Sequence, residues 1–136
     1  MSVHRPWSHE TELAAEASSV SRARTFVAGH LRDHALGSLV DDIELVVSEL
    51  ATNAVMHAGS AITVTLRAFE QTVLLEVLDG AQTGPTVRSS RTLDTDGRGM
   101  AIVQALSRDW GVNARGTAGK SVWAAFEIEG ARCRQP

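Results

Sequence analysis

Residues 41–58, DDIELVVSELATNAVMHA, form the segment that most constrains the fold of this chain. Its apolar residues recur at intervals of three and four, the spacing of one buried helix face. They are Ile43, Val46, Val47, Leu50, Ala51 and Ala54. Asp41 and Asp42 open the segment, where negative charge suits the positive end of the helix dipole, and Gly59 follows it. The segment therefore predicts an amphipathic helix with one face packed against another layer.

An earlier helix is predicted from Ser18 or Ser19, whose hydroxyl oxygens suit an N-cap. Its apolar face consists of Val20, Ala23, Phe26, Val27 and Leu31. Gly37 is expected to end this helix, because glycine readily adopts the left-handed conformation found at helix C-termini. The first dozen residues are polar and irregular, so residues 1–16 are expected to be a flexible arm or a short edge strand.

Strand character follows the long helix in two runs, residues 61–68 and 72–79. In the first run apolar and polar residues alternate, which indicates a sheet with one covered face. The link between the runs is short, so they are expected to pair as an antiparallel hairpin. Residues 98–110 predict a third helix, and residues 110–116 and 120–129 predict a final hairpin. This order predicts an α/β two-layer sandwich, with helices on one face of a mixed, mostly antiparallel sheet.

The length of 136 residues fits one domain, with residues 17–130 as its folded part and residues 131–136 as a tail. The net charge of −3 gives no electrostatic reason to expect nucleic acid as a partner. Cys133 is the only cysteine and cannot form an internal disulfide. No apolar run approaches the ~20 residues of a membrane span, so a cytoplasmic protein without a membrane partner is expected.

Glu49 and Asn53 are four residues apart on the predicted helix, so both project from nearly the same side. They border the apolar stripe, which places them at the rim of a pocket beside the core. A carboxylate can accept a proton, and an amide oxygen can bind Mg²⁺. Taken alone, the pair is better explained as solvated residues on a helix surface, and His57 as a residue at the helix end.

Three further motifs suit a ligand, although each also has a simpler explanation. Asp79 follows an apolar strand, where it can accept a hydrogen bond from an amino group or form a turn. Residues 97–99, GRG, lie at the end of a loop over residues 80–97, and can wrap phosphate groups or act as a hinge. Residues 119–121, GKS, are either a ligand contact or a hairpin turn. The sequence contains no P-loop, Rossmann fingerprint or metal-binding Cys/His spacing.

Taken in order, these motifs resemble the series found in Bergerat-fold ATPases, the group that holds gyrase, histidine-kinase catalytic domains and bacterial anti-sigma-factor kinases. SELATNAVMHA resembles their N box, DG their first glycine box, GRGMAIVQALSRDWGV their second, and GKSVWAAFEI the last box with its strand. The similarity covers about residues 17–129, and SELATNA and GRGMAIV most resemble the anti-sigma-factor serine/threonine kinases. The resemblance implies a Bergerat ATP-binding fold with ATP and Mg²⁺ as cofactors.

The resemblance also implies a role for each motif. Glu49 is the expected general base, Asn53 the Mg²⁺ ligand, and Asp79 the partner of the adenine amino group. Residues 97–99 are expected to wrap the phosphates, with residues 81–96 as a lid. The full set of expected cofactor-binding residues is Asn53, His57, Asp79, Gly80, Gly97, Arg98, Gly99, Met100, Lys120 and Ser121.

The chain departs from this family at Ala81, where the first glycine box usually has a glycine, and its next glycine is Gly84. The favoured function is a kinase that phosphorylates a serine or threonine of an antagonist protein and otherwise holds a sigma factor inactive. The alternative is a non-catalytic partner-binding module of the same fold with weak or no nucleotide binding, because a methyl group at position 81 crowds the nucleotide. An intact Glu49 favours the kinase, since a pure binder needs no base.

A third interpretation, the detached catalytic domain of a sensor histidine kinase, is less favoured. The chain contains no helix pair for dimerisation and no phosphoacceptor segment upstream of the predicted domain. The family resemblance also implies a homodimer, formed through the N-terminal region and the edge of the sheet.

Overall fold

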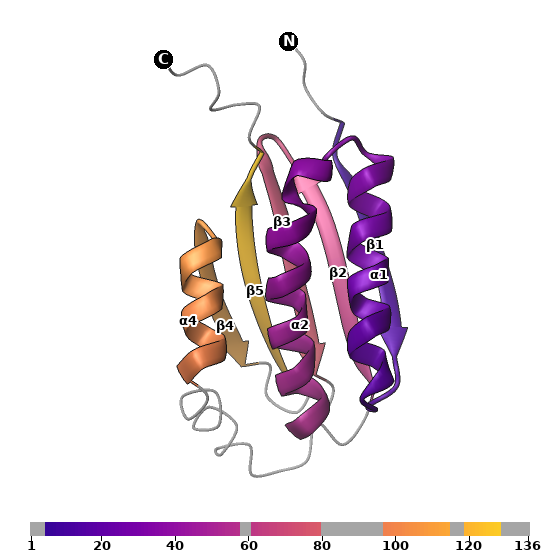
Figure 1. Ribbon diagram of the computed structural model, residues 1–136, viewed down its shortest axis with the longest axis vertical. Coiled ribbons are helices and arrows are strands. Elements are labelled where there is room, and N and C mark those ends of the chain that lie inside the picture. Colours follow the sequence, from indigo (N-terminus) through magenta and orange to yellow (C-terminus); the bar gives the residue numbers. More distant parts are fainter. Residues whose placement is uncertain (1–4, 58–60, 80–96, 115–118, 129–136) are drawn as a thin grey trace.

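The computed structural model describes residues 5–57, 61–79, 97–114 and 119–128. Five strands form one sheet in the order β1-β2-β3-β5-β4, and three α-helices lie on one face of it (Figure 1). Along the chain the elements are β1 (Trp7–Leu13), α1 (Ser18–Asp33), the 3₁₀ turn η1 (Gly37–Leu39), α2 (Val40–His57), β2 (Ile62–Phe69), β3 (Thr72–Asp79), α4 (Gly97–Leu106), β4 (Asp109–Ala114) and β5 (Lys120–Glu127).

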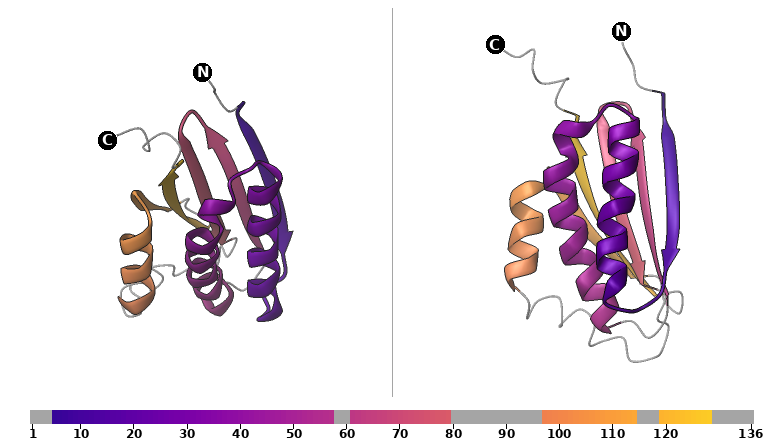
Figure 2. Two further views of the ribbon diagram at one scale, coloured as in Figure 1. Left: turned by 45° about the horizontal axis from the view of Figure 1, so that its top comes forward. Right: turned by 45° about the vertical axis from the view of Figure 1, so that its right-hand side comes forward.

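The predicted α/β two-layer sandwich is confirmed. Figure 2 shows α1, α2 and α4 on the same side of the strands, with α2 between the other two helices. Every strand pairing in the described part of the chain is antiparallel, so the parallel pairs of the expected mixed sheet are not found there. Residues 7–13 adopt the edge strand that was one of the two forms expected for the N-terminal segment.

The core lies between the helices and the sheet. Along α2 the residues at intervals of three and four are fully or almost fully buried, as their spacing predicts. They meet the inward-facing residues of β2 and β3, where alternate positions are buried. Burying one such side chain contributes about 2 kcal/mol to stability. The largest fully buried apolar residues are Leu31, Ile43, Ile62, Leu66, Leu75, Val27, Val46, Val47, Val64, Val73 and Val103.

The start of α1 differs from the prediction. Neither Ser18 nor Ser19 is the N-cap residue, because Ala17 occupies that position and no side chain caps the helix. The Ser19 side chain is fully buried, and its hydroxyl donates a hydrogen bond of 2.6 Å to the carbonyl oxygen of Ala14. The Ser19 hydroxyl therefore donates a hydrogen bond to the chain before the helix and does not accept one from the N–H groups of the first helical turn.

The end of α1 also differs, because Ala35 and not Gly37 adopts the left-handed conformation, with a φ of 61°. The Leu36 N–H donates to the Leu31 carbonyl at 2.7 Å, and the Ala35 N–H donates to the Arg32 carbonyl at 3.0 Å. These two hydrogen bonds form a Schellman motif, which satisfies carbonyls at the helix end. Leu36 is buried, so packing of the residue after the turn places the left-handed position two residues before the glycine.

Replacing Ala35 with glycine is expected to raise the free energy of unfolding by about 0.5–1 kcal/mol. Alanine is strained at this φ and glycine is not, although the added freedom of glycine in the unfolded chain offsets part of the gain. Urea denaturation measures the difference, and Gly37→Ala is a matched control because a Cβ at Gly37 meets no atom within 4 Å. A fall in stability for Ala35→Gly would contradict the interpretation.

The third helix is shorter than predicted, since α4 ends at Leu106 and not at Trp110. The Ser107 hydroxyl donates to the Val103 carbonyl at 2.6 Å, which competes with continuation of the helix. The Arg108 N–H then donates to the Ala125 carbonyl at 2.8 Å, so the chain joins the sheet before β4 begins. Trp110 packs against the core from this strand, opposite Ala124. A continued helix and a strand would both place an apolar residue at position 110. Only the pairing with β5 shows that Trp110 belongs to a strand.

In the described part of the chain, α2 and the other helices are too short or too polar to cross a membrane. The predicted tail, residues 131–136, lies outside the described residues.

Candidate functional site: a pocket at the end of the central strands

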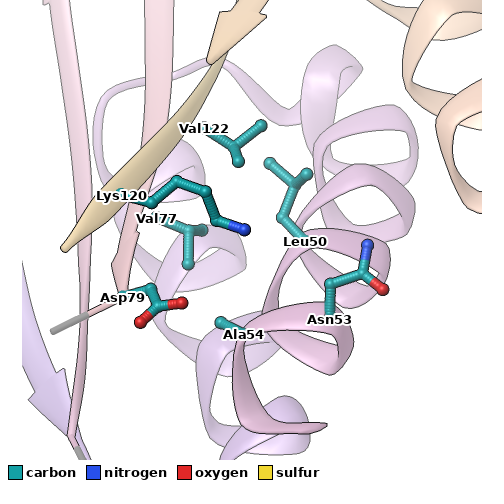
Figure 3. Close-up of a pocket in the computed structure, with 7 residues that line it drawn as sticks. All are labelled: Leu50, Asn53, Ala54, Val77, Asp79, Lys120 and Val122. Carbon is teal, nitrogen blue, oxygen red and sulfur yellow. The ribbon is translucent and has the colours of Figure 1, made fainter. Parts of the chain in front are cut away.

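Three polar residues from three different elements line one pocket beside the core (Figure 3). Asn53 comes from α2, Asp79 is the last residue of β3, and Lys120 is the first residue of β5. The apolar residues around them are Leu50, Ala54, Val77 and Val122. The enclosed space is small, about 10 Å³, which is the room of one water molecule. The described walls can therefore hold only one part of a larger ligand.

The register of the sheet explains why Asp79 and Lys120 meet. These two residues are direct partners in the antiparallel pairing of β3 and β5, and Val77 and Val122 are the partners two positions further along. Directly opposed residues of an antiparallel pair place their side chains on the same face. All four side chains therefore face α2, and the two valines form an apolar floor beneath the two charged groups.

Asn53 carries a buried amide N–H donor that lacks a partner among the described residues. The residue is 7% exposed, and its Nδ2 atom is buried without a hydrogen-bond partner in the part of the chain that the structure describes. Leaving a buried donor unpaired costs about 1–3 kcal/mol, so such groups are rare and call for an explanation. A ligand with an acceptor oxygen would pair this donor.

The pocket holds charges of both signs. Asp79 is 7% exposed, and Lys120 is half-buried with its amine directed from β5 towards α2 (Figure 3). Burial lowers the pKa of Lys120, while the neighbouring Asp79 carboxylate acts in the opposite direction. A buried carboxylate suits a ligand amino group, and an ammonium group in a weakly hydrated pocket suits a phosphate or another acceptor.

Comparison with known protein families matches residues 13–126 to the histidine kinase-like ATPase domain. This chain belongs to that family. The match covers every described element from the end of β1 to β5, and it implies that the domain binds ATP. Among curated proteins, no significant match to the chain was found. The ATP-binding fold expected from the motifs is therefore confirmed at the level of the family.

The donor set of this ATPase domain fits Mg²⁺ bound together with nucleotide phosphates. Within the described ranges, no three His, Cys, Asp or Glu side chains are grouped so that they could hold a metal ion. Mg²⁺ commonly takes only one or two ligands from the protein and the rest from water and substrate phosphates. The Asn53 amide, a hard oxygen ligand beside an unpaired N–H donor, suits that arrangement. The residues present therefore fit Mg²⁺·ATP.

Glu49 and Ser121, which the sequence predicted as site residues of the ATPase domain, do not line the pocket. Glu49 is half-buried one helical turn before Asn53 and does not line the hollow. Ser121 is fully buried, but its hydroxyl donates to Glu76 Oε2 at 2.8 Å. Successive residues of a strand point to opposite faces, so Lys120 faces the pocket and Ser121 faces away from the helices. Ser121 therefore does not join Lys120 at the expected adenine contact.

The second glycine box forms the first turn of α4, because this helix begins at Gly97. Gly97, Arg98 and Gly99 thus lie where a helix N-terminus presents N–H groups and positive dipole, as expected for phosphate binding. Met100 is half-buried and packs against the hydrophobic core, so in this structure it supports the helix and does not line the pocket. The Arg98 side chain lies outside what the structure describes.

Several predictions fall outside the described residues of the ATPase domain. Gly80, Ala81 and the expected lid over residues 81–96 are not described, and neither is the side chain of His57, the last residue of α2. The sequence interpretation, for its part, did not assign the apolar pocket residues Leu50, Ala54, Val77 and Val122 to the site. Their periodicity marked the first two as core residues, and only the register of the sheet shows that they also form the pocket wall.

Proposed function

We propose that this domain binds Mg²⁺·ATP in the pocket and transfers the γ-phosphoryl group to a serine or threonine of an antagonist protein. In its other state it holds a sigma factor inactive. The observation that supports this most directly is the buried, unpaired Nδ2 donor of Asn53 in one pocket with Asp79 and Lys120. These residues supply a metal ligand, an acceptor for the adenine amino group and a positive charge.

Each residue has a separate role in the proposed reaction. When bound, ATP supplies the phosphoryl group, and Mg²⁺ neutralises the charge on its phosphates. Asp79 would hold the adenine ring at the end of β3, and Asn53 would hold the metal ion from α2. The N–H groups at the N-terminus of α4, which begins at Gly97, would bind the phosphates. Phosphoryl transfer depends mainly on such positioning and charge neutralisation, which these residues would supply.

Glu49 is the proposed general base. It accepts the proton of the attacking hydroxyl group while the oxygen of that group forms the new bond to phosphorus, and ADP leaves. Its position supports this role because it lies on the same side of α2 as Asn53, one turn away, and is half-buried. The partner hydroxyl would then approach from outside the pocket, past the rim of α2.

The second candidate function is a partner-binding module of the same fold with weak or no nucleotide binding. Two observations favour it: Glu49 does not line the pocket, and Ala81 replaces a glycine of the nucleotide-binding motif. Such a module sequesters its partner without phosphorylating it. A homodimer through the N-terminal region and sheet edge is compatible with both functions.

Calorimetric titration with ATP, with and without Mg²⁺, tests the nucleotide site. We expect a dissociation constant of about 10 μM or tighter with Mg²⁺, and binding at least about tenfold weaker without it. GTP serves as a control, because its O6 acceptor opposes the Asp79 carboxylate where adenine presents an amino group. Absence of ATP binding under both conditions would overturn the kinase proposal and favour the partner-binding module.

A further inference from the structure

A cluster of aromatic rings joins β1 to the C-terminal part of α1, away from the nucleotide pocket. Trp7 and His9 come from β1, and His30 and His34, one helical turn apart, come from α1 and its C-cap. The Trp7 and His34 rings stack at 3.9 Å with an interplanar angle of 5°, and the His9 and His30 rings stack at 3.7 Å and 11°. Phe26 meets His30 edge-on at 4.8 Å.

The two stacks are joined by a hydrogen bond between imidazole rings. The Nε2 atoms of His9 and His34 are 3.0 Å apart, while the ring centroids are 5.3 Å apart, so the rings meet head to head. One ring donates the proton and the other accepts it, whichever tautomers are adopted. This linear contact suits a shared proton. To bind a metal ion, the two Nε2 lone pairs would have to point towards one common position, whereas here the two atoms face each other directly. In addition, no group of three metal-binding side chains occurs in the described ranges.

The surroundings favour the neutral form of His30. Burial lowers the pKa of His30 most, and His9 and His34 lower it further, whereas Asp33 acts in the opposite direction. The paired strand adds no charge at these positions, because the residues of β2 opposite Trp7 and His9 are the buried Ala68 and Leu66.

The remaining charged residues of the two elements are exposed to solvent. On β1, Glu10 and Glu12 are exposed and alternate to the other face of the sheet. On α1, Arg22, Arg24 and Arg32 are exposed. Asp33 is therefore the acidic residue that opposes the effects of burial and of the neighbouring histidines on His30.

We propose that Trp7, His9, His30 and His34 form a proton-controlled clasp that holds the edge strand β1 against α1 and releases it as the pH falls. In the closed clasp one proton lies between the Nε2 atoms of His9 and His34. A further proton on that pair leaves two N–H donors facing each other without an acceptor. A proton on His30 places a positive charge against the face of His9, in a setting that is partly desolvated.

The direction of the pH effect follows from linkage between protonation and docking. Because His30 binds a proton less readily when the clasp is closed, the open form takes up more protons below the ordinary histidine pKa of about 6.5. Docking of β1 is therefore complete above this pH and weakens as the pH falls through the lowered pKa of the closed form. For each extra proton the docking equilibrium changes by up to about tenfold per pH unit.

Hydrogen–deuterium exchange followed by NMR tests the clasp without any nucleotide. Between about pH 7.5 and pH 5.5, the exchange rates of the β1 amides, corrected for their intrinsic pH dependence, are expected to rise about tenfold relative to β3. The β3 amides report global unfolding, because this strand is central in the sheet. Equal changes in β1 and β3, or no change in β1, would overturn the proposal.

Two variants separate the clasp from a purely structural cluster. His30→Gln removes one titrating ring and is expected to reduce the pH-dependent rise in β1 exchange to less than about twofold. Asp33→Asn removes the group that favours the charged His30, and is expected to enlarge the rise and shift its midpoint to lower pH. The ¹⁵N signals of the histidine rings give an independent readout in the wild-type protein. Opposite Nε2 tautomers for His9 and His34 at neutral pH support the shared proton, and identical tautomers exclude it.

Discussion

Asn53→Ala is expected to abolish Mg²⁺-dependent ATP binding while making the protein more stable. Loss of the metal ligand should weaken Mg²⁺·ATP binding by about 100-fold or more, which is about 3 kcal/mol. Stability should rise by about 1 kcal/mol, because the variant removes a buried N–H without a partner and introduces a better helix former. Opposite effects on binding and stability are expected of a residue that is retained for its ligand.

Calorimetry and urea denaturation on the same samples measure the two effects. Thr52→Ala is the matched control, because Thr52 is half-buried on α2 but does not line the pocket. The control should retain the ATP affinity of the wild-type protein. If Asn53→Ala keeps the ATP affinity of the wild-type protein, the pocket does not contain the metal site. A large loss of stability would mean that the amide has a structural partner.

Glu49→Gln is expected to reduce the rate of phosphoryl transfer by about 10²–10⁴-fold while leaving ATP affinity within about twofold. Glutamine keeps the size of the side chain and loses only the ability to accept a proton. Because Glu49 lies one turn from Asn53 and outside the pocket wall, its charge contributes little to nucleotide binding. The separation of rate from affinity distinguishes a base from a binding residue.

Release of ADP from Mg²⁺·ATP, in single-turnover and steady-state assays, measures this rate before a partner is identified. Glu44→Gln is the control, since Glu44 is also a half-buried glutamate of α2, and it lines a separate hollow beside Arg24 and Ser48. Turnover equal to wild type in Glu49→Gln would refute the assignment of the base. Binding of ATP without measurable turnover in the wild-type protein would favour the partner-binding module.

The elements that the sequence predicted well depend on local periodicity. The long helix was expected at residues 41–58 and is found at Val40–His57, and the two central strands differ from the prediction by one residue or less at each end. A helix face and a strand face are each defined by residues within one segment, so the pattern of apolar side chains is sufficient. The motifs on these elements indicated the ATP-binding fold only through their resemblance to a known family.

The predictions that failed concern the ends of elements. The left-handed turn lies at Ala35 because Leu36 is buried after it, and the last helix stops at Leu106 because Arg108 pairs with Ala125. Neither outcome is encoded by the nearest glycine or by the spacing of apolar residues. Both depend on contacts with residues distant in the sequence.

The site divides in the same way. The sequence by itself determined which residue types are available, namely the Asn53 amide, the Asp79 carboxylate and the Lys120 ammonium group, and their order along the chain. Only the tertiary structure placed Lys120 opposite Asp79, turned Ser121 to the other face, and brought His9 against His30 and His34. The physical reason is that strand register and helix docking minimise the free energy of the whole core, and no single segment contains that information.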